Sequence, residues 1–149
     1  LIAWKLKNPE NCGNLIRLAD NIGFSKVIFI NGDNNISIRK IKKTAGNSYQ
    51  VMPSVFLSEK ELTTMLPDHY SLVAVETESS SSNIFTSKLP DNIALVVGNE
   101  KKGIDIDFIK KCEMVVHIPL TGNCTSLNVS HAATVAAFEW QRQKMNTIV

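Results

Sequence analysis

The sequence has few cysteines, and their arrangement excludes two classes of small protein. Its three cysteines, Cys12, Cys112 and Cys124, are scattered and form no C-x-x-C pair. This pattern argues against a disulfide framework and against a zinc site, so no metal is expected. Free cysteines fit a reducing compartment, and we therefore expect a cytoplasmic location.

Long apolar runs and a strong net charge are also lacking. No stretch approaches the roughly 18 consecutive apolar residues that would suggest a membrane-spanning helix. No secretory signal opens the chain, although Leu1 in place of Met suggests a trimmed start. The net charge of +2 is too small for a protein that coats nucleic acid by charge alone, but it leaves room for a local basic patch.

What is present is an alternation of short apolar runs and helical patterns within 149 residues, which predicts one domain over 1–149. The runs are β-branched and nearly continuous, as in strands that helices bury on both faces. Strands are expected at 26–30, 71–75, 93–97 and 114–118, a shorter one within 1–6, and an edge or irregular piece at 51–57, which contains Pro53. Helices are expected at 13–22, 36–44, 58–66, 104–111 and about 128–144. The fold class is therefore α/β, with a mainly parallel sheet and helices on both faces.

Arg17 lies on the first expected helix, opposite its apolar side and among polar residues. Taken alone, this position is typical of a solvated surface residue. It also suits a group that faces a substrate, because Asn11 and Gly13 precede it in a loop after a strand. A guanidinium can hold a phosphate through two parallel hydrogen bonds. Both interpretations remain open at this stage.

Two further stretches follow buried strands. Gly98, Glu100 and Gly103 form a G-x-E-x-x-G pattern, which indicates either a tight strand-to-helix loop or a close backbone approach to a ligand. Ser126, Asn128 and Ser130 open the last helix after a long polar loop. One such residue would serve as a helix cap, but three at alternate positions exceed that need.

The last helix and a basic segment suggest partners. Residues 132–138 are apolar or small all the way round, so we expect cover on more than one side, more readily from a second subunit than within one chain. Residues 38–43 place four cations on the polar side of a short helix, as a phosphate-contacting patch or a solvated face: Arg39, Lys40, Lys42 and Lys43. The polar loop at 77–83 is taken as a flexible connector.

Together, the three stretches closely resemble the motifs of the SpoU (TrmH) RNA ribose 2′-O-methyltransferases of the SPOUT class. Asn11 and Arg17 match N-x5-R; the glycine pattern at 98–103 matches the second motif, and S-x-N-x-S at 126–130 matches the third. The match runs from about residue 8 to about residue 142. The absence of an added RNA-binding domain is similar to the short TrmL-like members, which implies tRNA rather than ribosomal RNA as the substrate.

The resemblance implies a C-terminal deep trefoil knot, a homodimer formed through the C-terminal helix, and S-adenosylmethionine bent within the knot. The implied catalytic residues are Arg17, Asn11, Glu100, Ser126 and Asn128. The implied cofactor-binding residues are Val75, Glu76, Thr77, Gly98, Asn99, Gly103, Ile118, Pro119, Leu120, Ser126 and Leu127. The implied RNA-binding residues are Arg17 and the four cations at 38–43.

Arg17 would activate the ribose 2′-hydroxyl in this family. Because a guanidinium is a poor base, we expect it instead to bind the adjacent phosphate and stabilise the forming alkoxide, with that phosphate or Arg17 transiently accepting the proton. Two other classes remain open: a knotted module that binds RNA or the cofactor without chemistry, and an unrelated small-molecule enzyme of flavodoxin-like layout.

Overall fold

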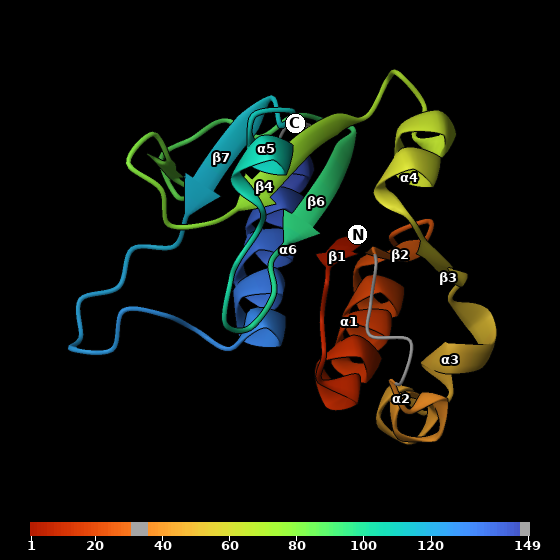
Figure 1. Ribbon diagram of the computed structural model, residues 1–149. Coiled ribbons are helices and arrows are strands. Elements are labelled where there is room, and N and C mark those ends of the chain that lie inside the picture. Colours follow the sequence, from red (N-terminus) through yellow and green to blue (C-terminus); the bar gives the residue numbers. More distant parts are fainter. Residues whose placement is uncertain (31–35, 147–149) are drawn as a thin grey trace.

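The protein, described here by a computed structural model of residues 1–30 and 36–146, is built on a seven-stranded parallel sheet with the strand order β3-β2-β1-β6-β4-β7-β5. The strands are β1 (Ile2–Trp4), β2 (Val27–Ile30), β3 (Ser54–Leu57), β4 (Ser71–Val75), β5 (Ser82–Asn83), β6 (Ile93–Val97) and β7 (Met114–His117). The helices are α1 (Pro9–Ile22), α2 (Ile38–Ala45), α3 (Ser48–Val51), α4 (Glu59–Met65), α5 (Ile106–Ile109) and α6 (Val129–Asn146). Figure 1 shows their arrangement.

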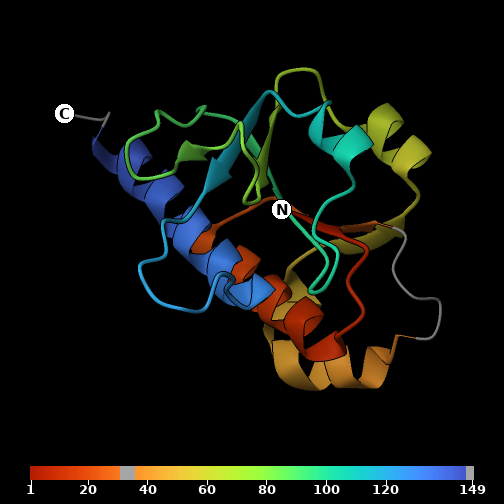
Figure 2. The same cartoon turned by 60° about the vertical axis from the view of Figure 1, so that its left-hand side comes forward.

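Two apolar cores cover the two faces of the sheet, as the continuous apolar strands predict. On one face, α1 and α6 pack over the strands and α2 packs against α1, and Ala133, Ala136 and Ala137 of α6 are fully buried there. On the other face, Leu62 of α4 and Phe108 of α5 pack beside Trp4. Figure 2 shows the two groups of helices on opposite sides of the sheet. The predicted α/β class with a parallel sheet is confirmed.

The first helix begins earlier than predicted. The side chain of Asn8 accepts a hydrogen bond from the backbone N–H of Glu10, and Pro9 occupies the first turn, where its missing N–H costs nothing. Asn11 and Gly13 therefore lie on the helix and not in a loop. This places Asn11 on the same rigid element as Arg17.

Other boundaries moved by a few residues. The strand expected within 1–6 is Ile2–Trp4, after which Lys5 adopts a left-handed backbone with a φ of 51°. The piece at 51–57 is the edge strand β3, which begins just after Pro53. The helix expected at 104–111 is limited to Ile106–Ile109. Both α3 and β5 are additions, and β5 lies within the expected connector at 77–83.

The last helix has one covered side and one open side in the single chain. Phe138 is 49% exposed, and Leu127, just before the helix, is 41% exposed. A helix covered all round by its own chain was the alternative to a partner subunit, and the exposure of Phe138 contradicts it. Among the described helices, none has the length and apolar content needed to cross a bilayer.

Candidate active site

Three polar side chains from distant parts of the chain meet in one hydrogen-bonded row. The Asn11 amide donates to the Glu100 carboxylate at 3.0 Å (Nδ2 to Oε1), and the Asn128 amide donates to Asn11 Oδ1 at 3.1 Å. Asn11 is only 4% exposed. Because buried amides need partners, this row holds the start of α1, the loop after β6 and the start of α6 in fixed positions.

Each end of the row also serves a helix start. Glu100 accepts the backbone N–H of Asn8 at 3.2 Å and, more weakly, that of Lys7 at 3.4 Å. Its negative charge therefore lies beside the amino end of α1, where the helix dipole favours an anion. Asn128 Oδ1 accepts the N–H and the hydroxyl of Ser130 at 2.8 and 2.7 Å. Capping explains Ser130 and part of Asn128, but it does not explain the contact between Asn128 and Asn11.

The two motif glycines are required by a tight loop. Asn99 and Gly103 exchange both backbone hydrogen bonds at 3.0 Å, which closes the loop. A Cβ at Gly98 would lie 2.6 Å from the Gly103 carbonyl carbon. Gly103 has a φ of +67°, and a Cβ there would lie 2.3 Å from the Glu76 carboxylate, which accepts the Ile104 N–H at 3.0 Å. The glycines thus let Glu76, at the end of β4, pack against the loop after β6.

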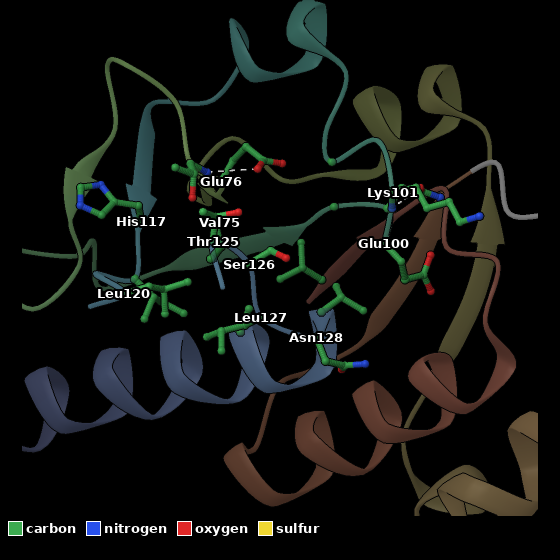
Figure 3. Close-up of a pocket in the computed structure, with 18 residues that line it drawn as sticks. Val75, Glu76, Glu100, Lys101, His117, Leu120, Thr125, Ser126, Leu127 and Asn128 are labelled. Carbon is green, nitrogen blue, oxygen red and sulfur yellow. Dashed lines mark hydrogen bonds between the residues drawn. The ribbon is translucent and has the colours of Figure 1, made fainter. Parts of the chain in front are cut away.

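A cavity of about 550 Å³ opens at the carboxyl ends of β6, β4 and β7, the edge at which parallel sheets bind ligands (Figure 3). Of the residues predicted to bind a cofactor, those that line it are Val75, Glu76, Thr77, Gly98, Asn99, Gly103, Ile118, Leu120, Ser126 and Leu127. Pro119 does not. Glu100 and Asn128 of the hydrogen-bonded row also line the cavity, so the second and third motifs share one wall.

Several cavity residues were not predicted from the sequence. They are Val97, Lys101, His117, Thr125, Val129 and Ala132. Most directly adjoin a predicted residue along the chain, so extending each strand end and motif by one position would have found them. His117 is held by Ser81 of the connector, with 2.9 Å between Nδ1 and the hydroxyl oxygen. The 77–83 segment therefore helps to shape the cavity wall.

Arg17 lies outside the cavity in the single chain. It is exposed, does not line the cavity, and forms no hydrogen bond or ion pair with the part of the chain that the structure describes. Six residues separate it from Asn11, which corresponds to about 240° of rotation and about 9 Å along the helix. Its participation in catalysis remains a prediction.

The basic segment on α2 divides into different environments. Arg39, Lys40, Lys42 and Lys43 are all exposed. Lys42 lies over the Tyr49 ring, with its Nζ 5.2 Å from the ring centroid, and Lys40 lines a second hollow beside the cavity. The four cations therefore do not form one uniform surface.

The titratable groups near the row do not supply a nucleophile. Burial, and secondarily the charge of Glu100, raise the pKa of the Cys12 thiol to about 12, so this thiol stays neutral at physiological pH. Within residues 1–30 and 36–146, no group of three or more His, Cys, Asp or Glu side chains is arranged to hold a metal ion.

The fold is that of an α/β protein with a cavity at the carboxyl edge of a parallel sheet, the usual place of a ligand site in such folds. The SpoU rRNA Methylase family model matches residues 1–138, and the chain belongs to this family. Membership excludes the alternative of an unrelated enzyme of flavodoxin-like layout.

Relatives of known name support the same assignment. The 23S rRNA (guanosine-2′-O-)-methyltransferase RlmB of Haemophilus ducreyi is 34% identical over 149 residues, covering 98% of this chain and 60% of the relative. The RlmB of Blochmanniella floridana is 33% identical over 146 residues, covering 97% of this chain and 57% of the relative. The chain thus spans less than two thirds of the length of these relatives.

Solved structures confirm the fold. An AdoMet-bound rRNA methyltransferase from Sinorhizobium meliloti aligns with a TM-score of 0.84 at 23% identity, covering 95% of this chain and 54% of that one. The A. aeolicus TrmH/SpoU tRNA modifying enzyme aligns with a TM-score of 0.84 at 23% identity, covering 98% of this chain and 75% of that one.

Proposed function

We propose that the chain transfers a methyl group from S-adenosylmethionine to a ribose 2′-hydroxyl of RNA. The observation that carries the proposal is the row Asn11–Glu100–Asn128, which joins all three motifs at one cavity. The names of the RlmB relatives support the reaction class and the RNA substrate.

The cavity suits the cofactor in size and in chemistry. Its volume of about 550 Å³ falls within the range of small-molecule sites, roughly 300–1,000 Å³. Val75, Ile118 and Leu127 offer apolar surface to a flat base, while the tight loop at 98–103 brings backbone groups to the wall. The bound cofactor would supply an activated, positively charged methyl donor, and no metal enters the proposal.

The chain's own residues would align the reacting atoms and help to remove one proton. With cofactor and RNA bound, the ribose oxygen would attack the donor methyl group, and an O–C bond would form as the S–C bond breaks. The hydroxyl proton would pass to the adjacent RNA phosphate, while the Arg17 guanidinium would bind that phosphate and stabilise the alkoxide by its positive charge. Asn11, Glu100 and Asn128 hold the walls, and Ser126 lines the cavity in which the reacting groups would meet.

We further propose that Arg17 reaches a site completed by a second subunit. The open side of α6, with Phe138 half-exposed, offers an apolar surface for a two-fold homodimer. A C-terminal trefoil knot, in which the loop at 118–128 leads into α6, is part of this proposal. An RNA substrate also fits the predicted cytoplasmic location.

Ribosomal RNA is the first substrate to test. The sequence favoured tRNA, but both RlmB relatives above are named for 23S rRNA, whereas the A. aeolicus structure is of a tRNA-modifying enzyme. A knotted module that binds without chemistry remains the second candidate, because the row by itself only positions groups.

Labelled methyl transfer to purified ribosomal RNA and to total tRNA tests the proposal. We expect transfer by the native protein and its loss in Arg17→Ala, with unchanged cofactor affinity by calorimetry. Arg17→Lys keeps the charge but loses the two parallel hydrogen bonds, so an intermediate rate is expected. Undiminished transfer by Arg17→Ala would refute the role of Arg17, and cofactor binding without transfer to either RNA would favour the binding module.

A further inference from the structure

A second hollow, of about 960 Å³, adjoins the cavity on the side of β1 and α2. Asn99, Glu100 and Lys101 line both, so the two spaces share a wall. Its lining carries five lysines against three acidic residues, a net charge of +2 (5 − 3), which equals the net charge of the whole chain. Positive charge is therefore concentrated beside the place where the methyl group would be transferred.

The lysines come from separate segments of the chain. Lys5 and Lys7 follow β1, Lys40 lies on α2, and Lys101 and Lys102 lie in the loop after β6. Side chains from three segments that converge on one hollow differ from a run of cations on one solvated helix face. Figure 3 shows the Lys101 side chain extending away from the other labelled cavity residues.

Most of this positive charge is not neutralised by a neighbour. Lys5 is ion-paired with Asp105 across the hollow. The other four, Lys7, Lys40, Lys101 and Lys102, form no ion pair within residues 1–30 and 36–146. Of the three acidic residues, Glu100 is already bonded to Asn11 and to the start of α1. Four lysines are therefore free to bind an anionic ligand.

We propose that this hollow holds the phosphate backbone of the RNA strand next to the nucleotide being methylated. The inference rests on the proposed function, since it takes RNA as the ligand of the adjoining cavity. None of the described lining residues is aromatic, so the hollow has no ring on which a base could stack. It binds phosphates without reading bases, and sequence selectivity arises elsewhere.

The test compares two double variants that each remove two positive charges. Lys7→Gln/Lys102→Gln removes two free cations of the hollow. Lys60→Gln/Lys88→Gln is the matched control, because these lysines are exposed and line neither the cavity nor the hollow. Fluorescence anisotropy measures the binding of fluorescein-labelled oligouridylate and oligoadenylate of about 12 nucleotides. The salt concentration is varied from about 50 to about 300 mM, because the release of counterions from phosphates makes the affinity depend on salt in this range.

Each lost phosphate contact on a single strand should reduce the slope of log K against log salt by about 0.7. The hollow variant should therefore lose about 1.4 in slope and about 25-fold in affinity near 0.1 M salt, equally for both oligonucleotides. The control should change neither. With an RNA that is methylated, the hollow variant should raise KM and leave kcat and cofactor affinity unchanged.

Lys40 provides a second, helix-matched comparison. Lys40→Gln should weaken oligonucleotide binding, whereas Lys43→Gln, on the same helix but outside the hollow, should not. Equal losses from both would indicate non-specific charge attraction and overturn the proposal.

Failure of this inference differs from failure of the proposed function. If the protein transfers methyl groups but the hollow variant binds RNA as well as the control variant does, the proposed role of the hollow is refuted and the proposed function stands. Absence of methyl transfer, with the expected loss of oligonucleotide binding, would refute the function and leave the hollow as an RNA-binding surface. If the hollow variant lost binding to poly-L-glutamate but kept its binding to RNA, the hollow would suit an acidic protein partner, and the proposal would be overturned.

Discussion

Replacing Glu100 by Ala tests whether the hydrogen-bonded row holds the site together. The carboxylate accepts the Asn11 amide at 3.0 Å, the Asn8 N–H at 3.2 Å and the Lys7 N–H at 3.4 Å. Alanine removes all three acceptors, and the Asn11 amide, only 4% exposed, is left unpaired. An unsatisfied buried donor costs about 1–3 kcal/mol. Because Glu100 itself is exposed and water can enter, we expect the lower part of that range, about 1–2 kcal/mol.

Two variants separate hydrogen bonding from charge. In Glu100→Gln, the amide oxygen can replace Oε1 and keep the bonds to Asn11 and Asn8, so only the long contact to Lys7 and the charge are lost. We expect about 0.3–1 kcal/mol, the usual value of an anion at a helix start. Glu10→Ala is the control, because Glu10 is an exposed acidic residue in the first turn of the same helix. It should resemble Glu100→Gln and not Glu100→Ala.

Denaturant unfolding and thermal melting measure these differences. For a chain of this size, 1 kcal/mol corresponds to about 2–4 °C in Tm, so Glu100→Ala should melt about 2–8 °C lower. A double-mutant cycle with Asn11→Ala should give a coupling of at least about 0.5 kcal/mol, as for residues in contact. Equal melting temperatures for Glu100→Ala and Glu10→Ala, with no coupling to Asn11, would show that the row contributes nothing beyond helix-end charge.

The remaining predictions concern the tight loop and pH. Gly103→Ala should lower the free energy of unfolding by more than about 1 kcal/mol and weaken cofactor binding, because the added Cβ would meet the Glu76 carboxylate at a positive φ. Gly122→Ala is the control, since no atom lies within 4 Å of the Cβ it would add, and it should change neither property. Denaturant unfolding and calorimetry compare the two variants. A hydrogen bond from Arg142 lowers the pKa of the Glu139 carboxyl group in the folded protein. The ionised Glu139 should therefore stabilise the fold fully above the unfolded pKa of about 4.3, and this stabilisation should be lost as the pH falls through the lower folded pKa. Glu139→Gln should flatten this part of the unfolding free energy measured against pH, and an unchanged pH profile would contradict the assignment.

The buried strands were the most predictable part of the fold. The β-branched runs at 71–75 and 93–97 coincide with β4 and β6, because residues buried on both faces leave an unbroken apolar pattern. The helix expected at 58–66 likewise coincides with α4, where Ser58 and Glu61 form a capping box at its start. In contrast, β5 and α3 contain no buried residue, so they carry no apolar pattern that could have indicated them, and they were missed.

The start of α1 was misread although its signals were present. Asn8 as a cap and Pro9 in the first turn together indicate a helix beginning at residue 9, but the apolar period alone begins later. Periodicity reports which side of a helix is buried by its own domain. It does not report that Asn11 is buried against groups 89 and 117 residues away. Only the joint presence of three motifs pointed to that contact, and only the folded chain shows its geometry.

The hydrogen bonds of the row limit which side chains can accept the proton of the 2′-hydroxyl. Glu100 already accepts three N–H bonds, and Asn11 is bonded through both ends of its amide, so these side chains hold the walls and have little capacity left to take a proton. Asn128 is similarly bonded to Asn11 and Ser130. A proton acceptor for the 2′-hydroxyl must therefore come from outside the row. The adjacent RNA phosphate, which Arg17 is proposed to bind, lies outside the row and is the acceptor that this arrangement leaves.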